Sequence, residues 1–324
     1  MAKPRADLLR RRFPTRTPLV RDGLRMLEKT LDSTTSTLLQ GETGSGKDFL
    51  AELVHFASVR CGGPFVRISC AAIPPELFER LFGHEKGAFT TDARARKPGL
   101  VETAHRGTLY LDEVSALSKP QQAKLLRLVQ EKAFTRIGGV AELSVDIRIM
   151  ASSTVPLGSL VKEGQFREDL YYRLDVISVT IPPLRERVRD IPRLAEVILA
   201  EEVRALDRTI SGFEPETIEL LQAHDWPGNV RELRSVIRRA LLMEEGDRLS
   251  PSSLPARSLR SESSLLQRAA AAGWNLERLE EEYIREVLRR TRDNNTRAAK
   301  VLGISRKTLI DKRRRYGIEK ARKR

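Results

Sequence analysis

Short apolar runs of strand type alternate with helical patterns between residues 36 and 181. Five of these runs are the predicted strands: TLLQG, FVRISC, TLYLDE, IRIMASS and VISVTIP. Helical spacing occupies the intervals, as in QQAKLLRLVQEKAF, where Ser118 and Gln121 form a capping-box pattern. Strands that alternate with helices predict an α/β fold with a parallel sheet covered by helices.

The pattern changes to helices alone after residue 186. The segments RLAEVILAEEVRAL, PETIELLQAH and NVRELRSVIRRALLM predict an all-α subdomain over 186–248. The stretch SPSSLPARSLRSESS (250–264) is rich in Ser, Pro and Arg and predicts a linker, placed at 249–274. Residues 275–324 are helical again. The predicted order is a basic N-terminal tail (1–17), an α/β core (18–185), the helical subdomain, the linker and a C-terminal helical domain.

Charge is concentrated at the two ends of the chain. Residues 1–17 carry six Lys or Arg against one acid, and residues 275–324 carry seventeen against eight. These basic ends indicate contact with nucleic acid, although a solvated charged face is the simpler interpretation of the tail. The two cysteines have no metal-ligand spacing, and no apolar run approaches the ~20 residues of a membrane span. We expect a cytoplasmic protein without membrane association.

The stretch GETGSGKD (41–48) follows an apolar run and precedes a helical pattern, which is the context of a phosphate-binding P-loop. The glycines let backbone N–H groups close on phosphates, and Lys47 would reach the β- and γ-phosphates. Asp48 stands where Ser or Thr is usual, and its carboxylate can hold a magnesium-bound water. A chance glycine-rich turn is the alternative. The predicted nucleotide-binding residues are Gly41, Glu42, Thr43, Gly44, Ser45, Gly46, Lys47 and Asp48.

A second part of the site comes from TLYLDEV (108–114). Two acids end an apolar strand, at the edge where ligands bind in open α/β sheets. Asp112 would hold Mg²⁺, and Glu113 would orient the attacking water. The alternative is a strand that merely ends in solvated acids, which the P-loop upstream makes the weaker interpretation.

These motifs together resemble the sigma-54-dependent transcriptional activators, the bacterial enhancer-binding proteins of the NtrC type. The matching stretches are GETGSGKD, FGHEKGAFT, GTLYLDEV, QAKLLRLVQE, FREDLYYRLDV, PPLRER and WPGNVREL, in the family's order across 18–245. The resemblance implies an AAA+ ATPase with a helical lid that uses ATP and Mg²⁺. About seventeen residues precede the ATPase, so we expect no receiver or ligand-sensing domain before it.

The resemblance assigns further residues of the site. Arg167 and Arg173 match arginines that reach the neighbouring subunit's nucleotide, and Arg231 matches the lid arginine, sensor II. Ser69 stands where the family has an asparagine that hydrogen-bonds the Walker B glutamate, and Thr154 stands where the sensor I asparagine is usual. Both keep a hydroxyl but lose an amide. We expect ATP binding to be retained and the link between hydrolysis and loop movement to be altered.

The segment EKGAFTTD (85–92) corresponds to the family's sigma-54-contact loop, GAFTGA. Gly87, Ala88, Phe89 and Thr90 are retained, and an exposed Phe on such a loop favours partner binding. The second Gly-Ala is replaced by Thr91-Asp92, which removes glycine freedom and adds a negative charge. A Phe folded back onto its own helix is the alternative.

The C-terminal sequence predicts a long helix over 275–291 and two shorter helices around Gly303, with Ser305 as an N-cap. This is a helix-turn-helix, and it resembles the Fis-type domain of the same family. The long helix is also expected to pair two subunits. The predicted DNA-binding residues are Thr296, Ser305, Arg306, Lys307, Thr308, Lys312, Arg313 and Arg314, of which Lys312 to Arg315 are expected to contact phosphates.

The predicted function is an ATP-hydrolysing, oligomeric activator, dimer to hexameric ring, that binds double-stranded DNA at enhancer-like sites and remodels sigma-54 RNA polymerase to the open complex. The main alternative is a DNA- and ATP-binding regulator that no longer engages sigma-54, which the Thr91-Asp92 ending favours. A general AAA+ remodeller of another substrate is disfavoured by the GAFT loop and the helix-turn-helix.

Overall fold

The computed structural model describes residues 3–72, 81–85, 97–255, 269, 273–291 and 293–318. The chain divides into two compact units, Met1–Pro255 and Ala256–Arg324, each of which is described by itself. The predicted sigma-54-contact residues Gly87, Ala88, Phe89 and Thr90, with Thr91 and Asp92, lie outside the described residues.

The five predicted strands form one sheet, which confirms the α/β prediction. They are β1 (Thr37–Gln40), β2 (Phe65–Ser69), β5 (Thr108–Asp112), β8 (Arg148–Ser153) and β9 (Ile177–Thr180). The order across the sheet is β2-β5-β8-β1-β9, and every pairing is parallel. The carboxyl ends of β1 and β5 therefore open at the same edge, with only β8 between them.

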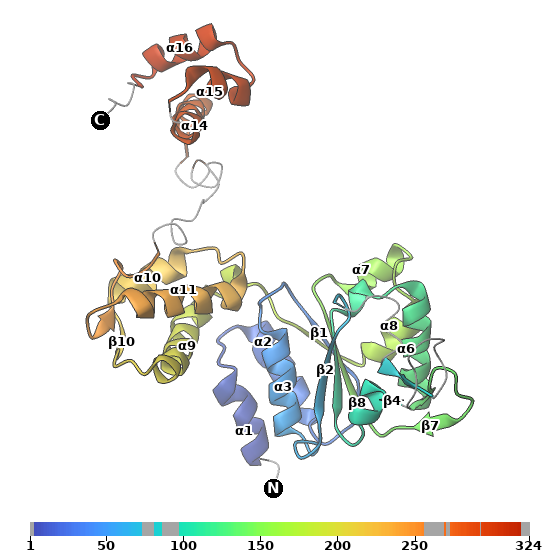
Figure 1. Ribbon diagram of the computed structural model, residues 1–324. Helices are drawn as coiled ribbons and strands as arrows, with labels where there is room; N and C mark the ends of the chain where they lie inside the picture. The colour runs from blue at the N-terminus through green and yellow to red at the C-terminus, as the bar shows by residue number, and fades with distance from the viewer. Residues whose placement is uncertain are drawn as a thin grey trace. The chain divides into compact units, whose positions relative to one another are not determined.

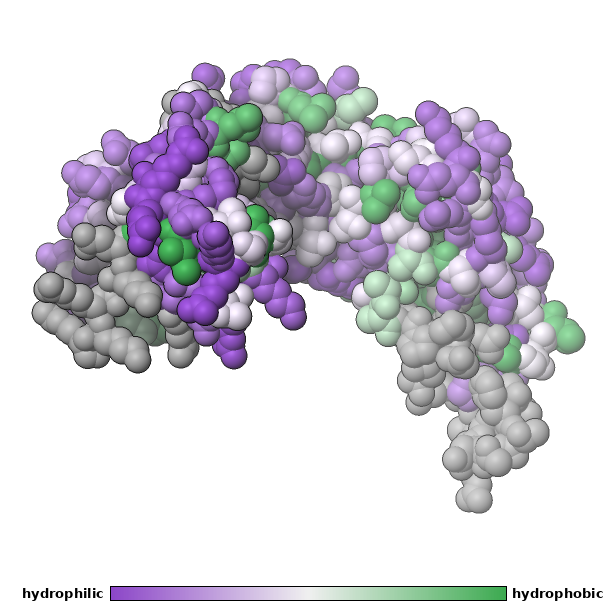
Figure 2. All heavy atoms as spheres, turned by 90° about the horizontal axis from the view of Figure 1, so that it is seen from above, coloured by the Kyte–Doolittle hydropathy of each residue, from purple (hydrophilic) through white to green (hydrophobic). Residues whose placement is uncertain are grey.

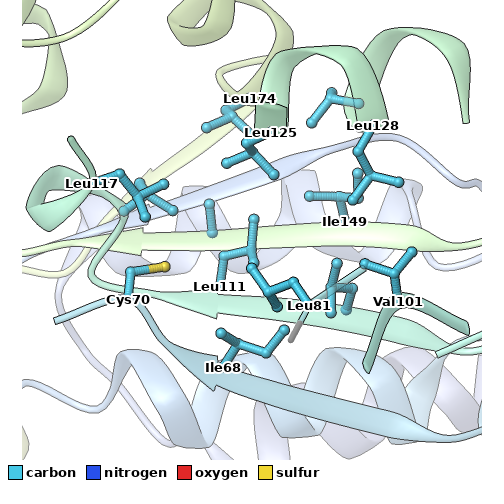
Figure 3. Packing of buried hydrophobic residues seen from close by; sticks show 14 of the residues in the cluster. Ile68, Cys70, Leu81, Val101, Leu111, Leu117, Leu125, Leu128, Ile149 and Leu174 are labelled. Atoms are coloured by element: carbon cyan, nitrogen blue, oxygen red, sulfur yellow. The ribbon is translucent and has the colours of Figure 1, made fainter. Parts of the chain in front are cut away.

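Helices cover both faces of this sheet (Figure 1). One face carries α1 (Lys3–Arg12), α2 (Pro18–Lys29) and α3 (Lys47–Ala57), and the other carries α6 (Lys119–Glu131), α7 (Leu157–Lys162) and α8 (Glu168–Leu174). Strand side chains alternate between the two apolar clusters, as the period of two requires. Tyr110 packs on the α3 side, whereas Leu111 packs on the α6 side, where Figure 3 shows it near Ile68, Leu125 and Ile149.

The predicted basic N-terminal tail is part of the folded ATPase unit, so that prediction was wrong. Helix α1 packs against α3. Leu9 and Phe13, four residues apart on one side of the chain, are 0% and 5% exposed. The hydroxyls of Thr15 and Thr17 both donate to the Asp190 carboxylate, at 2.6 and 3.1 Å. The charge count missed this stripe because two apolar residues at helical spacing suffice to dock a short helix.

The ATPase unit also contains several short helices and strands outside the five-stranded sheet. The predicted capping box of α6 is confirmed, since the Ser118 backbone N–H donates to Gln121 Oε1 at 2.8 Å. The remaining short elements are β3 (Gly83–His84), β4 (Lys97–Pro98), α5 (Leu100–Thr103), η2 (Val114–Ala116), β6 (Ala133–Thr135), β7 (Glu142–Ser144), η3 (Leu184–Glu186) and η4 (Val188–Asp190).

The predicted helical subdomain consists of α9 (Ile191–Leu206), α10 (Pro215–Ala223) and α11 (Asn229–Met243), with a two-stranded pairing of β10 (Gly212–Phe213) and β11 (Arg248–Leu249). Its core includes Trp226, which is fully buried and donates from Nε1 to the Leu221 carbonyl at 2.7 Å. Leu249 and Leu254 are also buried, so the packed unit extends past residue 248, where the linker was predicted to begin.

The C-terminal unit is the predicted helix-turn-helix. It comprises α14 (Leu276–Arg290), α15 (Asn295–Leu302) and α16 (Arg306–Arg315) around a core of Ile284, Val287, Leu288, Ala298, Ala299 and Leu309. Gly303 ends α15 in the left-handed conformation (φ 67°), which favours glycine.

The outer surface is mainly hydrophilic on the face seen in Figure 2, where hydrophobic residues occur in small separate groups. Among the described residues, no helix has both the length and the apolar character needed to cross a membrane.

Candidate functional site

The phosphate-binding loop joins β1 to α3, as the sequence predicts. Gly44 and Gly46 adopt φ of 76° and 106°, values that favour glycine, and a Cβ on Gly44 would lie 2.5 Å from the Gly228 carbonyl oxygen. The first helical N–H groups of α3 face the loop, which makes a site for an anion.

Lys47 is held inside this loop. Its Nζ donates to the carbonyls of Gly41 and Glu42 at 2.6 and 3.1 Å, and the side chain is 5% exposed. Burial lowers the pKa of Lys47, while the charges of Glu113, Asp48 and Asp112 oppose that shift. The ammonium is thus positioned beside the carboxylates and needs only to exchange two carbonyl partners for phosphate oxygens.

Asp48 and Asp112 converge on one position. A single nitrogen, Arg67 Nη2, lies 2.5 Å from Asp48 Oδ2 and 2.6 Å from Asp112 Oδ2. Tyr110 donates to Asp48 at 2.8 Å and Ser152 donates to Asp112 at 2.7 Å, which fixes both carboxylates. Two carboxylates directed at one cation-sized position fit Mg²⁺, which binds through one or two carboxylates with phosphate oxygens and waters.

Glu113 follows directly and has a left-handed backbone (φ 62°, ψ 59°), an unusual conformation for a residue with a Cβ. Its backbone N–H donates to Ser152 Oγ at 3.0 Å. The carboxylate accepts from the Thr154 hydroxyl at 2.9 Å, from the Thr154 backbone N–H at 3.1 Å, and from the Ser115 hydroxyl. Strain of this kind is concentrated at functional sites, and here it turns the side chain toward Thr154.

Ser69 ends β2, at the position where the family has an asparagine. It lines the nucleotide cavity, but among the described residues its hydroxyl makes no hydrogen bond to Glu113. A serine side chain is shorter than the family's asparagine, and Thr154 and Ser115 hold the glutamate instead. The expectation that Ser69, at the family's switch position, alters the link between hydrolysis and loop movement stays a prediction, whereas Thr154 contacts Glu113 directly.

These residues line one cavity of about 460 Å³ between the α/β core and the lid. Predicted residues that line it are Thr43, Gly44, Ser45, Gly46, Lys47, Asp48, Ser69, Asp112, Glu113, Thr154 and Arg231. Two predicted nucleotide-binding residues, Gly41 and Glu42, are not part of its wall. Packing explains why position 41 is a glycine, because a Cβ there would lie 2.3 Å from the Ile181 carbonyl oxygen.

Glu42 faces the lid instead of the cavity. It pairs with Arg185 at 2.6 Å and accepts from Asn229 Nδ2 at 3.1 Å, and both contacts lower its pKa. Asn229 is fully buried and also donates to the Thr43 carbonyl at 3.1 Å. The next residue, Val230, donates its backbone N–H to Gly44 at 3.0 Å. The lid is thus bonded directly to the phosphate loop, beside Arg231.

Sequence reasoning missed several residues around the cavity. Phe13 stacks on Phe49 with ring centroids 6.4 Å apart and lies against Gly46. Arg187 is 2% exposed and donates to the Ser45 carbonyl at 2.6 Å, and burial lowers its pKa to about 10. The sequence places Arg67 only within a predicted strand. No sequence signal distinguishes it, because its role depends on the register between β2 and β5.

Arg167 is the N-cap residue of α8 and Arg173 lies in its last turn, and neither side chain is in the wall of this cavity. Arg167 pairs with Asp169 at 2.7 Å, and both partners are substantially exposed. Arg173 is exposed as well. Neither side chain lines the cavity of its own subunit, so within one chain the structure does not join them to the phosphate site.

The start of α16 presents its polar residues outward. Ser305 caps the helix, as predicted, by accepting from the Thr308 backbone N–H at 3.0 Å. Arg306, Lys307 and Thr308 are exposed. In helix-turn-helix domains, the first residues of the second helix are the ones that contact base edges. Thr296, near the start of α15, is exposed too.

Two predicted phosphate contacts hold the domain together instead. Arg313 is 7% exposed and donates to Asn295 Oδ1 at 2.7 Å, with Asp293 at 3.3 Å. Lys312 pairs with Glu280 on α14 at 2.5 Å. Both side chains point into the domain because α14 and α15 cover that side of α16. Arg315 likewise pairs with Glu277, whereas Arg314 is exposed. DNA contact by Lys312 and Arg313 stays a prediction, and both side chains already have partners inside the domain.

Known protein families match three consecutive parts of the chain. Residues 14–180 match the sigma-54 interaction domain, residues 185–271 match the AAA+ ATPase lid domain, and residues 275–316 match the bacterial regulatory protein, Fis family. The sheet order, the phosphate loop and the lid thus define an AAA+ P-loop NTPase with a C-terminal helix-turn-helix.

Individual proteins are similar to this chain over most of its length. The regulatory protein AtoC of Escherichia coli is 43% identical over 314 residues, which cover 95% of this chain and 68% of that protein. The transcriptional regulatory protein FlbD of Caulobacter vibrioides is 39% identical, covering 93% and 69%. The phenol regulator MopR of Acinetobacter guillouiae is 41% identical over 88% of this chain and 52% of its own length.

A solved structure extends the similarity to the fold. NtrX from Brucella abortus in complex with ATP has a TM-score of 0.66 and 32% identity, covering 94% of this chain and 69% of that chain. The chain belongs to the family of sigma-54-dependent transcriptional regulators.

Proposed function

We propose that this regulator hydrolyses ATP in a homo-oligomeric ring and uses the hydrolysis to remodel sigma-54 RNA polymerase while bound to upstream DNA. The observation that carries the proposal is the arrangement of Lys47, Asp48, Asp112 and Glu113 around one cavity, with Glu113 held by Thr154. A protein that only binds nucleotide has no need of a strained glutamate beside the phosphate site.

In the proposed reaction, the backbone N–H groups of the phosphate loop and Lys47 bind the β- and γ-phosphates. Asp48 and Asp112 would hold Mg²⁺, which supplies charge compensation on the phosphate oxygens. Glu113 orients the attacking water, and Thr154 keeps its carboxylate turned toward the γ-phosphate position. Arg231 contributes a further cation from the lid, which the contacts of Asn229 hold against the loop.

Arg167 and Arg173 act across the subunit interface in this proposal. Their exposure and their distance from their own cavity support that role, because a neighbouring subunit can then receive them. A planar, permanently charged guanidinium suits a transferring phosphoryl group and can contribute about 10³–10⁵ in rate. Each active site is therefore completed by a neighbouring subunit of the homo-oligomer.

The two remaining partners are assigned to different ends of the protein. The GAFT segment (87–90) would contact sigma-54, and the start of α16 would contact base edges of double-stranded DNA through Arg306, Lys307 and Thr308. Arg314 is an exposed cation near the end of α16 and would contact a phosphate.

The test separates hydrolysis from partner contact. ATP hydrolysis is measured first by phosphate release, where Glu113→Gln is expected to lower kcat by at least about 10²-fold and leave ATP binding intact. Binding to sigma-54 is then measured with and without ADP and aluminium fluoride. A complex that forms only with the fluoride and disappears in Thr90→Ala supports the activator.

The rival function has its own outcome in the same experiment. A protein that hydrolyses ATP and binds DNA but forms no complex with sigma-54 would be the regulator that has lost sigma-54 contact. The replacement of the family's second Gly-Ala by Thr91-Asp92 is the observation that favours this rival. If Glu113→Gln hydrolyses ATP as fast as the unchanged protein, the assignment of the catalytic glutamate is wrong.

A further inference from the structure

Arg67 occupies the position between the two carboxylates of the metal site. Its Nη2 lies 2.5 Å from Asp48 and 2.6 Å from Asp112, distances of charge-assisted hydrogen bonds. The guanidinium carbon also lies 5.9 Å from the centre of the Tyr110 ring. One side chain thus contacts both predicted metal ligands and the tyrosine that fixes one of them.

The strand register explains why Arg67 points there. In the parallel pair of β2 and β5, Arg67 is opposite Tyr110 and Ser69 is opposite Asp112. Residues opposite each other in such a pair share a face, and Tyr110 packs on the α3 side. Asp48 is in the first turn of α3. Because β2 is next to β5, the long side chain of Arg67 reaches Asp112 on that strand and Asp48 at the start of α3.

The contact has an electrostatic consequence for a metal. Asp48 and Asp112 are 31% and 18% exposed at the side chain, so two negative charges near each other are only partly solvated. Arg67 compensates them without an added ion. A magnesium ion requires near-octahedral oxygen ligands at about 2.0–2.1 Å, which cannot be completed while a guanidinium nitrogen bridges the same oxygens.

We propose that Arg67 is an intramolecular cation that holds the metal position between Asp48 and Asp112 in the nucleotide-free protein and leaves it when Mg²⁺ arrives with ATP. The inference rests on the proposed ATPase function and adds a positioning residue to it. Arg67 then disfavours binding of the free divalent ion, so that the metal enters mainly as the nucleotide complex.

The departure of Arg67 needs no rearrangement of the fold. Its side chain is 42% exposed, so rotation into solvent is open to it. The β- and γ-phosphates supply the remaining oxygen ligands, which makes the metal a better partner for the two acids than the guanidinium. Without nucleotide those ligands are missing, and the guanidinium stays.

The test uses the full chain without nucleotide and Mn²⁺ as the probe, with free Mn²⁺ followed by electron paramagnetic resonance. In Arg67→Met, which keeps an unbranched apolar stem and removes the charge, Mn²⁺ is expected to bind about tenfold more tightly than in the unchanged protein, as two charge contacts are lost. Arg127→Met is the matched control, because Arg127 pairs with Glu131 at 2.8 Å away from the cavity.

A second substitution locates the effect. Arg67→Met combined with Asp112→Asn should lose the gain, since the ion then has one carboxylate fewer. Thermal unfolding of each variant shows that the fold is retained. Equal Mn²⁺ affinity in Arg67→Met and the unchanged protein would overturn the inference, as would a gain of the same size in Arg127→Met.

The same variants separate this inference from the proposed function. Binding of a fluorescent ATP analogue and phosphate release are measured in parallel. If ATP is hydrolysed with Mg²⁺ but Arg67→Met leaves the Mn²⁺ titration unchanged, only the role of Arg67 is wrong. If Arg67→Met gains Mn²⁺ affinity while no variant binds or hydrolyses ATP, the proposed ATPase fails and the cation contact stands.

Discussion

The phosphate loop and the recognition helix both gather charged side chains at a helix, but they use them in opposite ways. Around α3, Lys47 and Asp48 are held by neighbours that a ligand can replace, namely loop carbonyls and Arg67. On α16, Lys312 and Arg313 are held by Glu280 and Asn295, which are parts of the same small domain. The first arrangement is prepared for exchange and the second is part of the fold.

The size of the two units explains the difference. The ATPase unit has two large apolar clusters that supply much of its stability. Among its described residues, the C-terminal unit has a core of six buried apolar residues. Small cores supply little stability, and polar contacts between helices then matter more. A cation on a short helix of a small domain is therefore weak support for DNA contact.

The largest effect is expected from the buried arginine of the small domain. Arg313→Met should lower the free energy of unfolding of the C-terminal unit by about 2–3 kcal/mol, because it removes charge-assisted hydrogen bonds to Asn295 and Ile318. Arg314→Met, one position on and exposed, is the control and should change it by less than about 0.5 kcal/mol. Calorimetry of the full chain measures both variants. Equal destabilisation by the two substitutions would contradict the structural role assigned to Arg313.

The next effect concerns DNA. Arg306→Ala should weaken binding to the specific site by about 1–3 kcal/mol and relax specificity, since it removes a base-edge contact. Lys312→Ala should weaken binding by less than about 0.5 kcal/mol and leave the salt dependence unchanged, because Lys312 already pairs with Glu280.

Fluorescence anisotropy at two salt concentrations measures both variants on a specific site selected from a random library. A Lys312→Ala variant that lowers the salt slope by about one would return Lys312 to the phosphate contacts.

How much of this was predictable depends on whether a residue acts locally or through register. The five strands, the phosphate loop and the acids of β5 follow from periodicity and motif, because each is fixed within a few residues of chain. The docking of α1 depends on a few apolar residues, chiefly Leu9 and Phe13, and the surrounding basic charge conceals it.

Residues whose roles depend on packing were not predictable. Arg67 reaches the site through the pairing of β2 with β5, Asn229 through the seating of the lid, and Arg313 through the angle between α15 and α16. The partner of Glu113 could not be read from the sequence either, because side-chain length and the Thr154 contact decide which group holds that carboxylate.

A smaller effect is expected in the nucleotide site, where Thr154 contacts Glu113 and Ser69 does not. Thr154→Val keeps the shape and removes the hydroxyl that donates to Glu113, so kcat for ATP should fall by about tenfold. Ser69→Ala should change kcat by less than about twofold, because Ser69 does not bond to Glu113 here. Phosphate release at saturating ATP measures both. A larger loss in Ser69→Ala would restore Ser69 as the partner of the glutamate.

The smallest effect distinguishes the two units by their response to acid. The chain's histidines are all in the ATPase unit, and His55 there is 1% exposed, with Nδ1 2.9 Å from Thr108 Oγ1. Burial lowers the pKa of His55 from its ordinary value of 6.5. The unfolded chain then binds a proton that the folded unit excludes, so stability is full above about pH 6.5 and decreases as the pH falls toward the folded-state pKa.

The loss is at most about 1.4 kcal/mol per pH unit, and the C-terminal unit has no histidine to share it. Calorimetry of the full chain between about pH 7 and about pH 5.5 should show the ATPase transition moving to lower temperature by more than the C-terminal one. His55→Gln, which cannot titrate in this range, should flatten that dependence. If the slope of the ATPase transition is the same in His55→Gln, then His55 is already protonated in the folded unit or is solvated as it is in the unfolded chain, and the burial argument fails.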